Sequence, residues 1–132
     1  MPELPDVECY QRFFRETSLH REIVGVEVFN RRVLEGVSAQ RLRNALVGGA
    51  FGSTHRHGKY LFAEAPESLW LVLHFGMTGS LDYGRASSPG PYDRVVFAFD
   101  GGDRLAYVCP RMFGRIMLTA SVEQFIRARS LG

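Results

Sequence analysis

The sequence predicts a mainly β protein, an antiparallel eight-strand β-sandwich or pseudo-barrel with a helix flanking it near each terminus. Two observations indicate this class. Short apolar segments separated by glycine- and proline-containing turns fill the middle of the chain, and helical signals lie close to both ends. An antiparallel sandwich or pseudo-barrel is the natural way to bury such strands. With 132 residues, the chain is long enough for one domain with its own core.

The first two elements follow from a change in apolar spacing. A helix is predicted where apolar side chains recur at spacings of three and four: Val7, Tyr10, Phe13 and Phe14, within Pro5 to about Thr17. The next apolar segment has the two-residue period of a half-buried strand, with three valines on one face: Val24, Val26 and Val28, within Ile23–Phe29.

The remaining elements are predicted from caps, turns and apolar runs. They are a short helix from the N-cap Ser38 through Leu46, two strands around His57-Gly58 within residues 51–65, a buried strand over 69–75, a hairpin of strands 94–100 and 104–108 around Gly101-Gly102, a strand over 115–119, and a helix capped by Ser121 that runs to about Arg129. Residues 84–91 contain serine, glycine and proline, so we predict a mobile loop there.

Composition excludes several classes of protein. No stretch approaches the ~20 apolar residues of a membrane span, and no basic segment followed by an apolar run marks a secretory signal. The two cysteines have no CxxC spacing, which argues against a zinc site or a disulfide framework in this chain and favours a cytoplasmic location. The net charge of +2 alone does not indicate a polyanionic partner. Arginine supplies 15 of the 16 basic residues, so the single lysine, Lys59, stands out.

The first residues have the pattern of a catalytic amine. If Met1 is removed, the nitrogen of Pro2 becomes a secondary amine, with the carboxylate of Glu3 beside it. An α-amino group has a pKa of about 7.7–8.0, so a useful fraction is nucleophilic near neutral pH and would form an iminium with a sugar carbon. The alternative is an ordinary proline-flanked helix start, in which Pro5 and Asp6 suit the first turn.

Three glycine-containing segments offer further candidates. In the first, residues 55–60, Lys59 would contact a phosphate or donate a proton, and Gly58 would let the backbone approach a ligand. The alternative is a solvated strand end. His55 and His57 share a strand face, but no third metal ligand is evident near them, so we predict no metal site.

The other two segments place large side chains on loops. Met77 stands between two glycines directly after an apolar strand, where it would serve as a wedge into a base stack. Arg111 and Phe113 stand between a proline and a glycine, a pairing that would hold a base or fill a vacated stack. The alternatives are a tight turn with Met77 folded onto the sheet and a simple hairpin with Phe113 buried.

In combination, these segments resemble the N-terminal domain of the formamidopyrimidine-DNA glycosylase / endonuclease VIII family over essentially the whole chain. The motifs, in order, are Pro-Glu-Leu-Pro, Gly-Lys-Tyr, His-Phe-Gly-Met-Thr-Gly and Pro-Arg-Met-Phe-Gly, and Leu4 is more typical of the formamidopyrimidine branch. The resemblance implies base-excision repair by a bifunctional glycosylase and abasic-site lyase that removes oxidised purines.

The resemblance also implies roles for single residues. Pro2 would be the nucleophile, Glu3 the general acid/base, and Lys59 a catalytic contact to the lesion or its phosphate. The predicted DNA-binding residues are Arg56, His74, Met77, Arg111 and Phe113, of which the last three would fill the gap left by the flipped nucleotide. The implied partner is damaged double-stranded DNA, with no obligate protein partner and no membrane.

The chain departs from the family pattern at three positions. Asp6 stands where glutamate is common, Cys109 where many members have aspartate, and Met112 where many have a second arginine. We expect residues 1–132 to be the N-terminal catalytic domain. The helix–two-turn–helix domain and the zinc finger would follow Gly132, so no cofactor is expected in this chain. A damaged-DNA-binding module without turnover is the alternative function, and an interaction domain that no longer uses the inherited site is a third.

Overall fold

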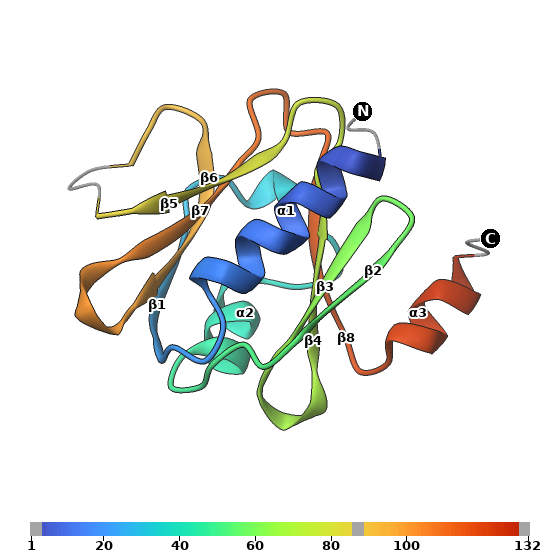
Figure 1. Ribbon diagram of the computed structural model, residues 1–132, viewed down its shortest axis with the longest axis horizontal. Coiled ribbons are helices and arrows are strands. Elements are labelled where there is room, and N and C mark those ends of the chain that lie inside the picture. The colour runs from blue at the N-terminus through green and yellow to red at the C-terminus, as the bar shows by residue number, and fades with distance from the viewer. Residues whose placement is uncertain (1–3, 86–88, 130–132) are drawn as a thin grey trace.

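The computed structural model describes residues 4–85 and 89–129. Within them, two four-stranded antiparallel sheets pack against each other, and three α-helices flank the sheets (Figure 1). The predicted fold class is thereby confirmed. The elements are α1 (Leu4–Thr17), β1 (Ile23–Val28), α2 (Ala39–Leu46), β2 (Thr54–His57), β3 (Tyr60–Glu64), β4 (Trp70–His74), β5 (Ser80–Gly84), β6 (Asp93–Phe99), β7 (Arg104–Val108), β8 (Arg115–Thr119) and α3 (Val122–Ala128).

The strand order is β1-β6-β7-β5 in one sheet and β2-β3-β4-β8 in the other, and every pairing of neighbours is antiparallel. The hairpin predicted around Gly101-Gly102 is confirmed as β6–β7. Strand β5 was not among the predicted segments, because none of its residues is fully buried and its pattern is weak. Residues 86–88 of the predicted loop lie outside the described residues.

The prediction that Val24, Val26 and Val28 share one face of β1 is wrong at Val24. Val24 is 51% exposed, whereas Ile23 and Val26 are buried. The pairing of β1 with β6 shifts register between Ile23 and Gly25. An irregularity of this kind interrupts the strict alternation of side chains, so the two-residue period does not extend through Val24.

The helices at the sheet edges close the sandwich. Helix α1 packs beside the edge strands β2 and β5 of the two sheets. Its Gln11 side-chain amide donates to the Thr54 hydroxyl at 3.2 Å, and its Phe13 ring meets the Tyr83 ring edge-on at 6.4 Å. Helix α2 packs beside β1, and its first turn is capped by Ser38, as predicted.

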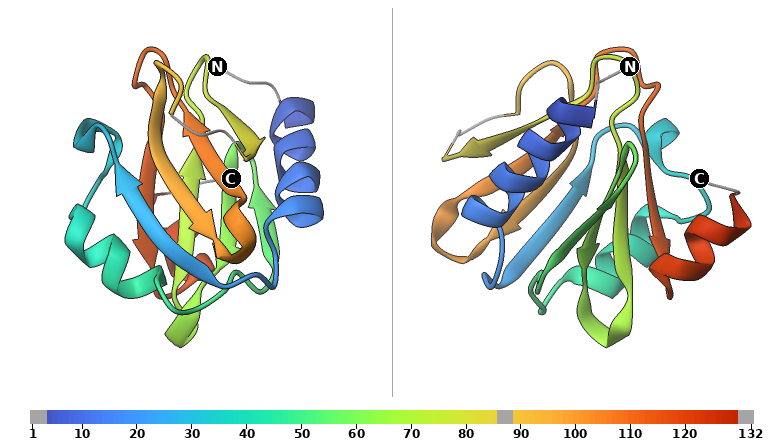
Figure 2. Two further views of the ribbon diagram at one scale, coloured as in Figure 1. Left: turned by 90° about the vertical axis from the view of Figure 1, so that its left-hand side faces the viewer. Right: turned by 45° about the vertical axis from the view of Figure 1, so that its right-hand side comes forward.

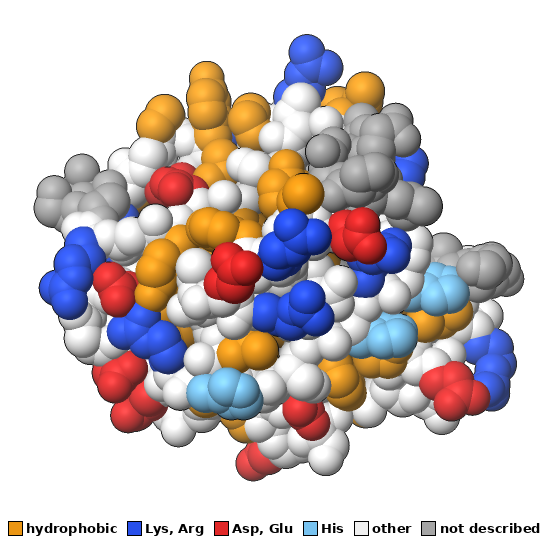
Figure 3. Space-filling view, viewed as in Figure 1, with side chains coloured by type: hydrophobic (Ala, Val, Ile, Leu, Met, Phe, Trp, Pro, Cys, Tyr) orange, Lys and Arg blue, Asp and Glu red, His pale blue; other side chains and the backbone are white. Residues whose placement is uncertain are grey.

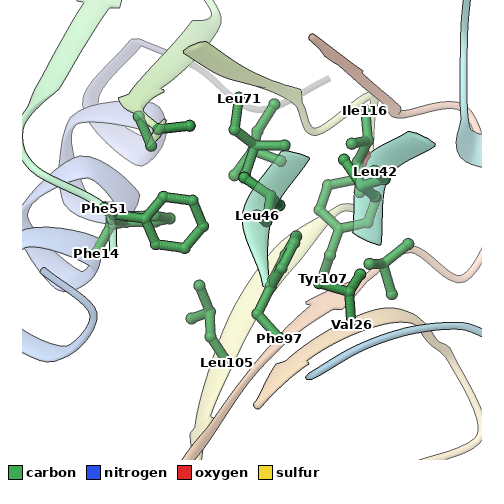
Figure 4. Packing of buried hydrophobic residues seen from close by; sticks show 14 of the residues in the cluster. Phe14, Val26, Leu42, Leu46, Phe51, Leu71, Phe97, Leu105, Tyr107 and Ile116 are labelled. Carbon is green, nitrogen blue, oxygen red and sulfur yellow. The ribbon is translucent and has the colours of Figure 1, made fainter. Parts of the chain in front are cut away.

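The main core lies between the sheets, where aromatic and branched aliphatic side chains interdigitate (Figure 4). A second, smaller cluster lies on the outer face of the β2-β3-β4-β8 sheet. There Phe62, Val72 and Met117 are buried, and α3 packs over them through Phe125 and Ile126 (Figure 2). Among the described residues, no helix combines the length and apolar character needed to cross a membrane.

Candidate functional site

Two glycine-containing loops come together at one end of the sandwich. Loop 75–79 joins β4 to β5, and loop 109–114 joins β7 to β8; we call them the rim loops. Ser80 pairs with Val108, and His74 pairs with Arg115, so the strand pairing brings the two loops to the same end. Both lie along the upper edge in Figure 1, where α1 also begins.

The rim loops expose large side chains. Met77 is 55% exposed and Phe113 is 56% exposed, and Arg111 is also exposed. Hydrophobic side chains and a basic side chain project from this upper edge in the space-filling view (Figure 3). Met112 instead packs against the main core, with a backbone φ of 55°. Exposing apolar surface opposes the hydrophobic effect, and a group of such side chains on one edge is typical of a binding surface.

Loop 109–114 is held by hydrogen bonds to its carbonyl groups. The Arg94 guanidinium donates to the carbonyls of Cys109 and Pro110, at 3.0 and 3.1 Å. From the other side, the Arg115 guanidinium donates to the carbonyls of Met112 and Gly114, both at 2.7 Å. Charge-assisted hydrogen bonds of this kind fix the loop conformation in which Arg111 and Phe113 face outward.

The imidazole of His74 stabilises the start of the other loop. The Gly76 amide donates to Nδ1 of His74 at 3.2 Å, and the Tyr60 ring lies 4.9 Å from the imidazole between centroids. Because Nδ1 accepts this hydrogen bond, the neutral ring carries its proton on Nε2, which is then available as a donor.

The surroundings of His74 favour this neutral form. Burial lowers the pKa of His74, and the positive charges of Lys59, Arg115 and Arg129 lower it further, against a smaller opposing effect of Glu35. Lys59 is therefore close enough to influence the charge of His74. The structure thus brings together two predicted site residues, one in the turn between β2 and β3 and the other at the end of β4.

Arg56 is placed differently from the other predicted residues. Its guanidinium donates to the Gly58 carbonyl at 3.2 Å and lies 3.9 Å from the Glu8 carboxylate of α1. It therefore faces the helix, and its contact with DNA stays a prediction. Pro2 and Glu3 lie outside the described residues; α1 begins at Leu4, the residue that follows them.

Three residues that shape the rim carry no signal in the sequence. Arg94 and Arg115 hold the loop carbonyls, and Tyr107 lies buried beneath both loops. No local sequence pattern identifies these residues, because their hydrogen-bond partners are backbone carbonyl groups. For Arg94 and Tyr107, those carbonyls are also distant in the sequence. Over the part of the chain that the structure describes, no group of three or more His, Cys, Asp or Glu side chains is arranged to hold a metal ion.

Comparison with known proteins identifies relatives over nearly the whole chain. The family model of the formamidopyrimidine-DNA glycosylase N-terminal domain matches residues 1–116. The formamidopyrimidine-DNA glycosylase of Moorella thermoacetica is 35% identical over 124 residues, which cover 93% of this chain and 45% of that protein. The enzyme of the same name from Pelobacter propionicus is 39% identical over 128 residues, covering 90% of this chain and 44% of that protein.

Solved structures give the same result. A structure of MutM in complex with carbocyclic 8-oxo-G containing DNA has a TM-score of 0.92 and 25% identity, covering 99% of this chain and 49% of that chain. Lactococcus lactis formamidopyrimidine-DNA glycosylase, non-covalently bound to DNA containing an AP site, also has a TM-score of 0.92, at 25% identity, covering 99% and 51%. The chain thus spans about half the length of these relatives.

Proposed function

The chain belongs to the formamidopyrimidine-DNA glycosylase family of DNA repair glycosylases through its N-terminal domain, and from this premise we propose that it forms the catalytic half of a base-excision repair enzyme. The enzyme would remove oxidised purines from DNA and cleave the strand at the resulting abasic site. The observation that carries the proposal is the pair of rim loops, which expose Met77 and Phe113 at the end of the sandwich where α1 begins.

The chemistry would start at the N-terminal proline. With Met1 removed, the secondary amine of Pro2 attacks C1′ of the deoxyribose, the bond from C1′ to the base breaks, and the base leaves. Glu3 then donates a proton to the ring oxygen O4′, the C1′–O4′ bond breaks, and the nitrogen lone pair forms an iminium with C1′. The resulting iminium acidifies the neighbouring C2′ proton, whose loss expels the 3′ phosphate and cleaves the strand. Water then releases the sugar from Pro2.

The rim loops would stabilise the DNA from which the damaged nucleotide has been removed. Flipping a nucleotide costs a few kcal/mol of stacking, and a stacked aromatic side chain contributes about 1–3 kcal/mol per base. Met77 and Phe113 would occupy the vacated space, with Arg111 beside them. The Nε2–H of His74 and the ammonium of Lys59 would then contact phosphate groups, which fix the register of the duplex.

A damaged-DNA-binding module without turnover is the second candidate. The chain spans about half the length of its relatives, so residues 1–132 taken by themselves would supply one wall of a DNA-binding cleft. Such a wall would bind duplex DNA weakly and with a shallow salt dependence, because the slope is about 0.9 per phosphate neutralised and the net charge is only +2.

Borohydride trapping on DNA distinguishes the two candidates. The chain is joined to the C-terminal half of the Moorella thermoacetica relative, and removal of Met1 is confirmed by mass. We expect a covalent adduct with a duplex that contains an abasic site and with one that contains an oxidised purine. Pro2→Gly should weaken trapping, Glu3→Gln should block base removal, and Phe113→Ala should weaken binding about tenfold, the factor for losing one stacked base. Val24→Ala, another exposed apolar truncation, is the control. Tight lesion binding without any adduct would favour the binding module.

A further inference from the structure

We propose that Tyr107 is a positioning residue that joins the two rim loops into one rigid unit, so that Met77 and Phe113 enter a DNA stack together. The proposal rests on the proposed function, since it concerns how the same surface meets DNA. It assigns a role to a buried tyrosine on β7 that touches neither the reacting sugar nor the exposed edge.

Tyr107 lies under the point where both loops begin or end. Its side chain is fully buried in the main core (Figure 4), and its ring lies 5.9 Å from that of Phe75, the first residue of loop 75–79. Its hydroxyl donates to the backbone carbonyl of His74, the last residue of β4. The tyrosine is therefore hydrogen-bonded to the base of the loop that carries Met77.

The same hydroxyl contacts the end of the other loop. A Cβ atom placed on Gly114 would overlap the Tyr107 hydroxyl and lie 2.5 Å from the His74 carbonyl oxygen. This position accepts no side chain, because the backbone of loop 109–114 rests directly on the hydrogen bond between Tyr107 and His74.

The two loops also touch each other through their backbones. A Cβ on Gly76 would lie 2.7 Å from the Gly114 nitrogen and 2.8 Å from the Phe113 carbonyl carbon. Gly114 in turn donates its amide to the Cys109 sulfur at 3.4 Å, which closes its own loop. Movement of one loop thus requires movement of the other, and the Tyr107 side chain contacts the backbone of both.

A tyrosine hydroxyl suits this role because it stays a donor. Burial, with a further contribution from Cys109, raises the pKa of Tyr107 far above its usual value. The phenol therefore stays protonated around neutral pH, where it can donate to the His74 carbonyl.

Amide hydrogen exchange on the chain itself tests the coupling without DNA. In the unaltered protein, the amides of Gly76, Gly79 and Gly114 should open as one cooperative unit. Tyr107→Phe keeps the ring and removes the hydroxyl, and we expect exchange at these amides to accelerate about five- to tenfold, the factor for the net loss of one hydrogen bond. Tyr83→Phe is the matched control, since it removes a hydroxyl that accepts from Arg21 near the other end of β7.

The outcomes separate a positioning role from a merely structural one. Faster exchange in both loops with Tyr107→Phe, and in neither with Tyr83→Phe, is the expected result. Acceleration in one loop only, or equal acceleration by both variants, would overturn the proposal. So would independent opening of the two loops in the unaltered protein, a measurement that needs no variant to fold.

A second experiment tests the consequence for DNA. Affinity for an abasic-site duplex is measured for the chain joined to the C-terminal half of its relative, with Met77→Ala, Phe113→Ala and both, each with and without Tyr107→Phe. When Tyr107 is present, we expect the losses of binding free energy from the two truncations to be non-additive. In the Tyr107→Phe background, the same two losses should add. Unchanged coupling would contradict the proposal. If the unaltered fusion does not bind DNA, the proposed function fails, and the exchange experiment still decides whether Tyr107 joins the loops.

Discussion

The two ends of β7 are built from different interactions. At the Val108 end, the rim loops meet backbone to backbone and leave Met77 and Phe113 exposed. At the Arg104 end, the turn between β6 and β7 carries a cluster of paired charges. There the Arg21 guanidinium donates to the Asp103 carboxylate at 2.9 Å and to the Asp100 carbonyl at 2.6 Å.

The charged end satisfies its own groups. The Asp103 carboxylate also lies 3.3 Å from the Arg85 guanidinium, so one carboxylate serves two arginines within the same chain. The rim does the reverse: its polar backbone is paired internally, and its large side chains point outward. The two ends thus differ in what they leave exposed: the charged end pairs its ionic side chains with one another, whereas the rim leaves large apolar side chains in solvent.

The largest effect that distinguishes the ends should come from Gly114→Ala. Because a Cβ at this position overlaps the Tyr107 hydroxyl, both rim loops must shift, and we expect unfolding free energy to fall by about 3 kcal/mol, the upper end of overpacking costs. Urea denaturation followed by tryptophan fluorescence measures this change. The loss should be insensitive to salt, since no charge is altered.

Gly25→Ala is the matched control for that prediction. A Cβ at Gly25 would make only an ordinary contact of 3.7 Å with the Ala98 Cβ. This variant should be neutral or slightly stabilising, by up to about 1 kcal/mol, through the unfolded state. Equal losses in the two variants would mean that the rim has no special close approach.

A smaller effect, with opposite salt behaviour, should come from Asp103→Asn at the charged end. The hydrogen bond from Arg21 lowers the pKa of Asp103 from its usual 3.8, burial opposes it with a smaller effect, and a hydrogen bond from Tyr83 lowers the pKa further by less than burial raises it. A lowered carboxyl pKa in the folded state adds stability above pH 3.8, and this contribution is lost as pH falls below that value. Thermal unfolding should therefore show a lower Tm for the variant at pH 7, with a gap that narrows on acidification and in high salt.

The contrast between the ends explains what could be predicted from the sequence. The hairpin at Gly101-Gly102 and the caps Ser38 and Ser121 are local signals, and the structure confirms all of them. The flanking glycines of Met77 predict its exposure for the same reason, and Met77 is exposed. Local chain geometry decides each of these features within a few residues.

Features that depend on the other sheet or on a neighbouring strand could not be predicted. The face of Val24 depends on an irregular pairing with β6. The frame of the rim depends on Tyr107 and Arg94, whose partners are backbone carbonyls that carry no sequence signature. The contact of Arg56 with Glu8 depends on where α1 packs. A resemblance to a family therefore identifies the exposed loop residues more readily than the buried residues that hold those loops in place.

The smallest expected effect concerns the pH dependence of the rim and comes from His74. Burial, then the charges of Lys59 and other basic residues, lower its folded-state pKa below 6.5. Well above pH 6.5 the imidazole is neutral in both the folded and the unfolded state, so its titration does not change the unfolding free energy. As pH falls below 6.5, the unfolded chain binds a proton that the folded chain resists, so unfolding free energy decreases until the folded pKa is passed. Protonation of Nδ1 would also remove the acceptor of the Gly76 amide, at the base of the loop that carries Met77.

His74→Gln tests this effect, because glutamine keeps an acceptor oxygen but does not titrate. Between pH 7.5 and pH 5, the Tm of the variant should fall less than that of the unaltered protein. Differential scanning calorimetry at low salt measures both curves. His55→Gln, which replaces an exposed histidine of β2, controls for the loss of a histidine as such. If His74→Gln follows the unaltered curve through this range, the titration of His74 does not reach the rim.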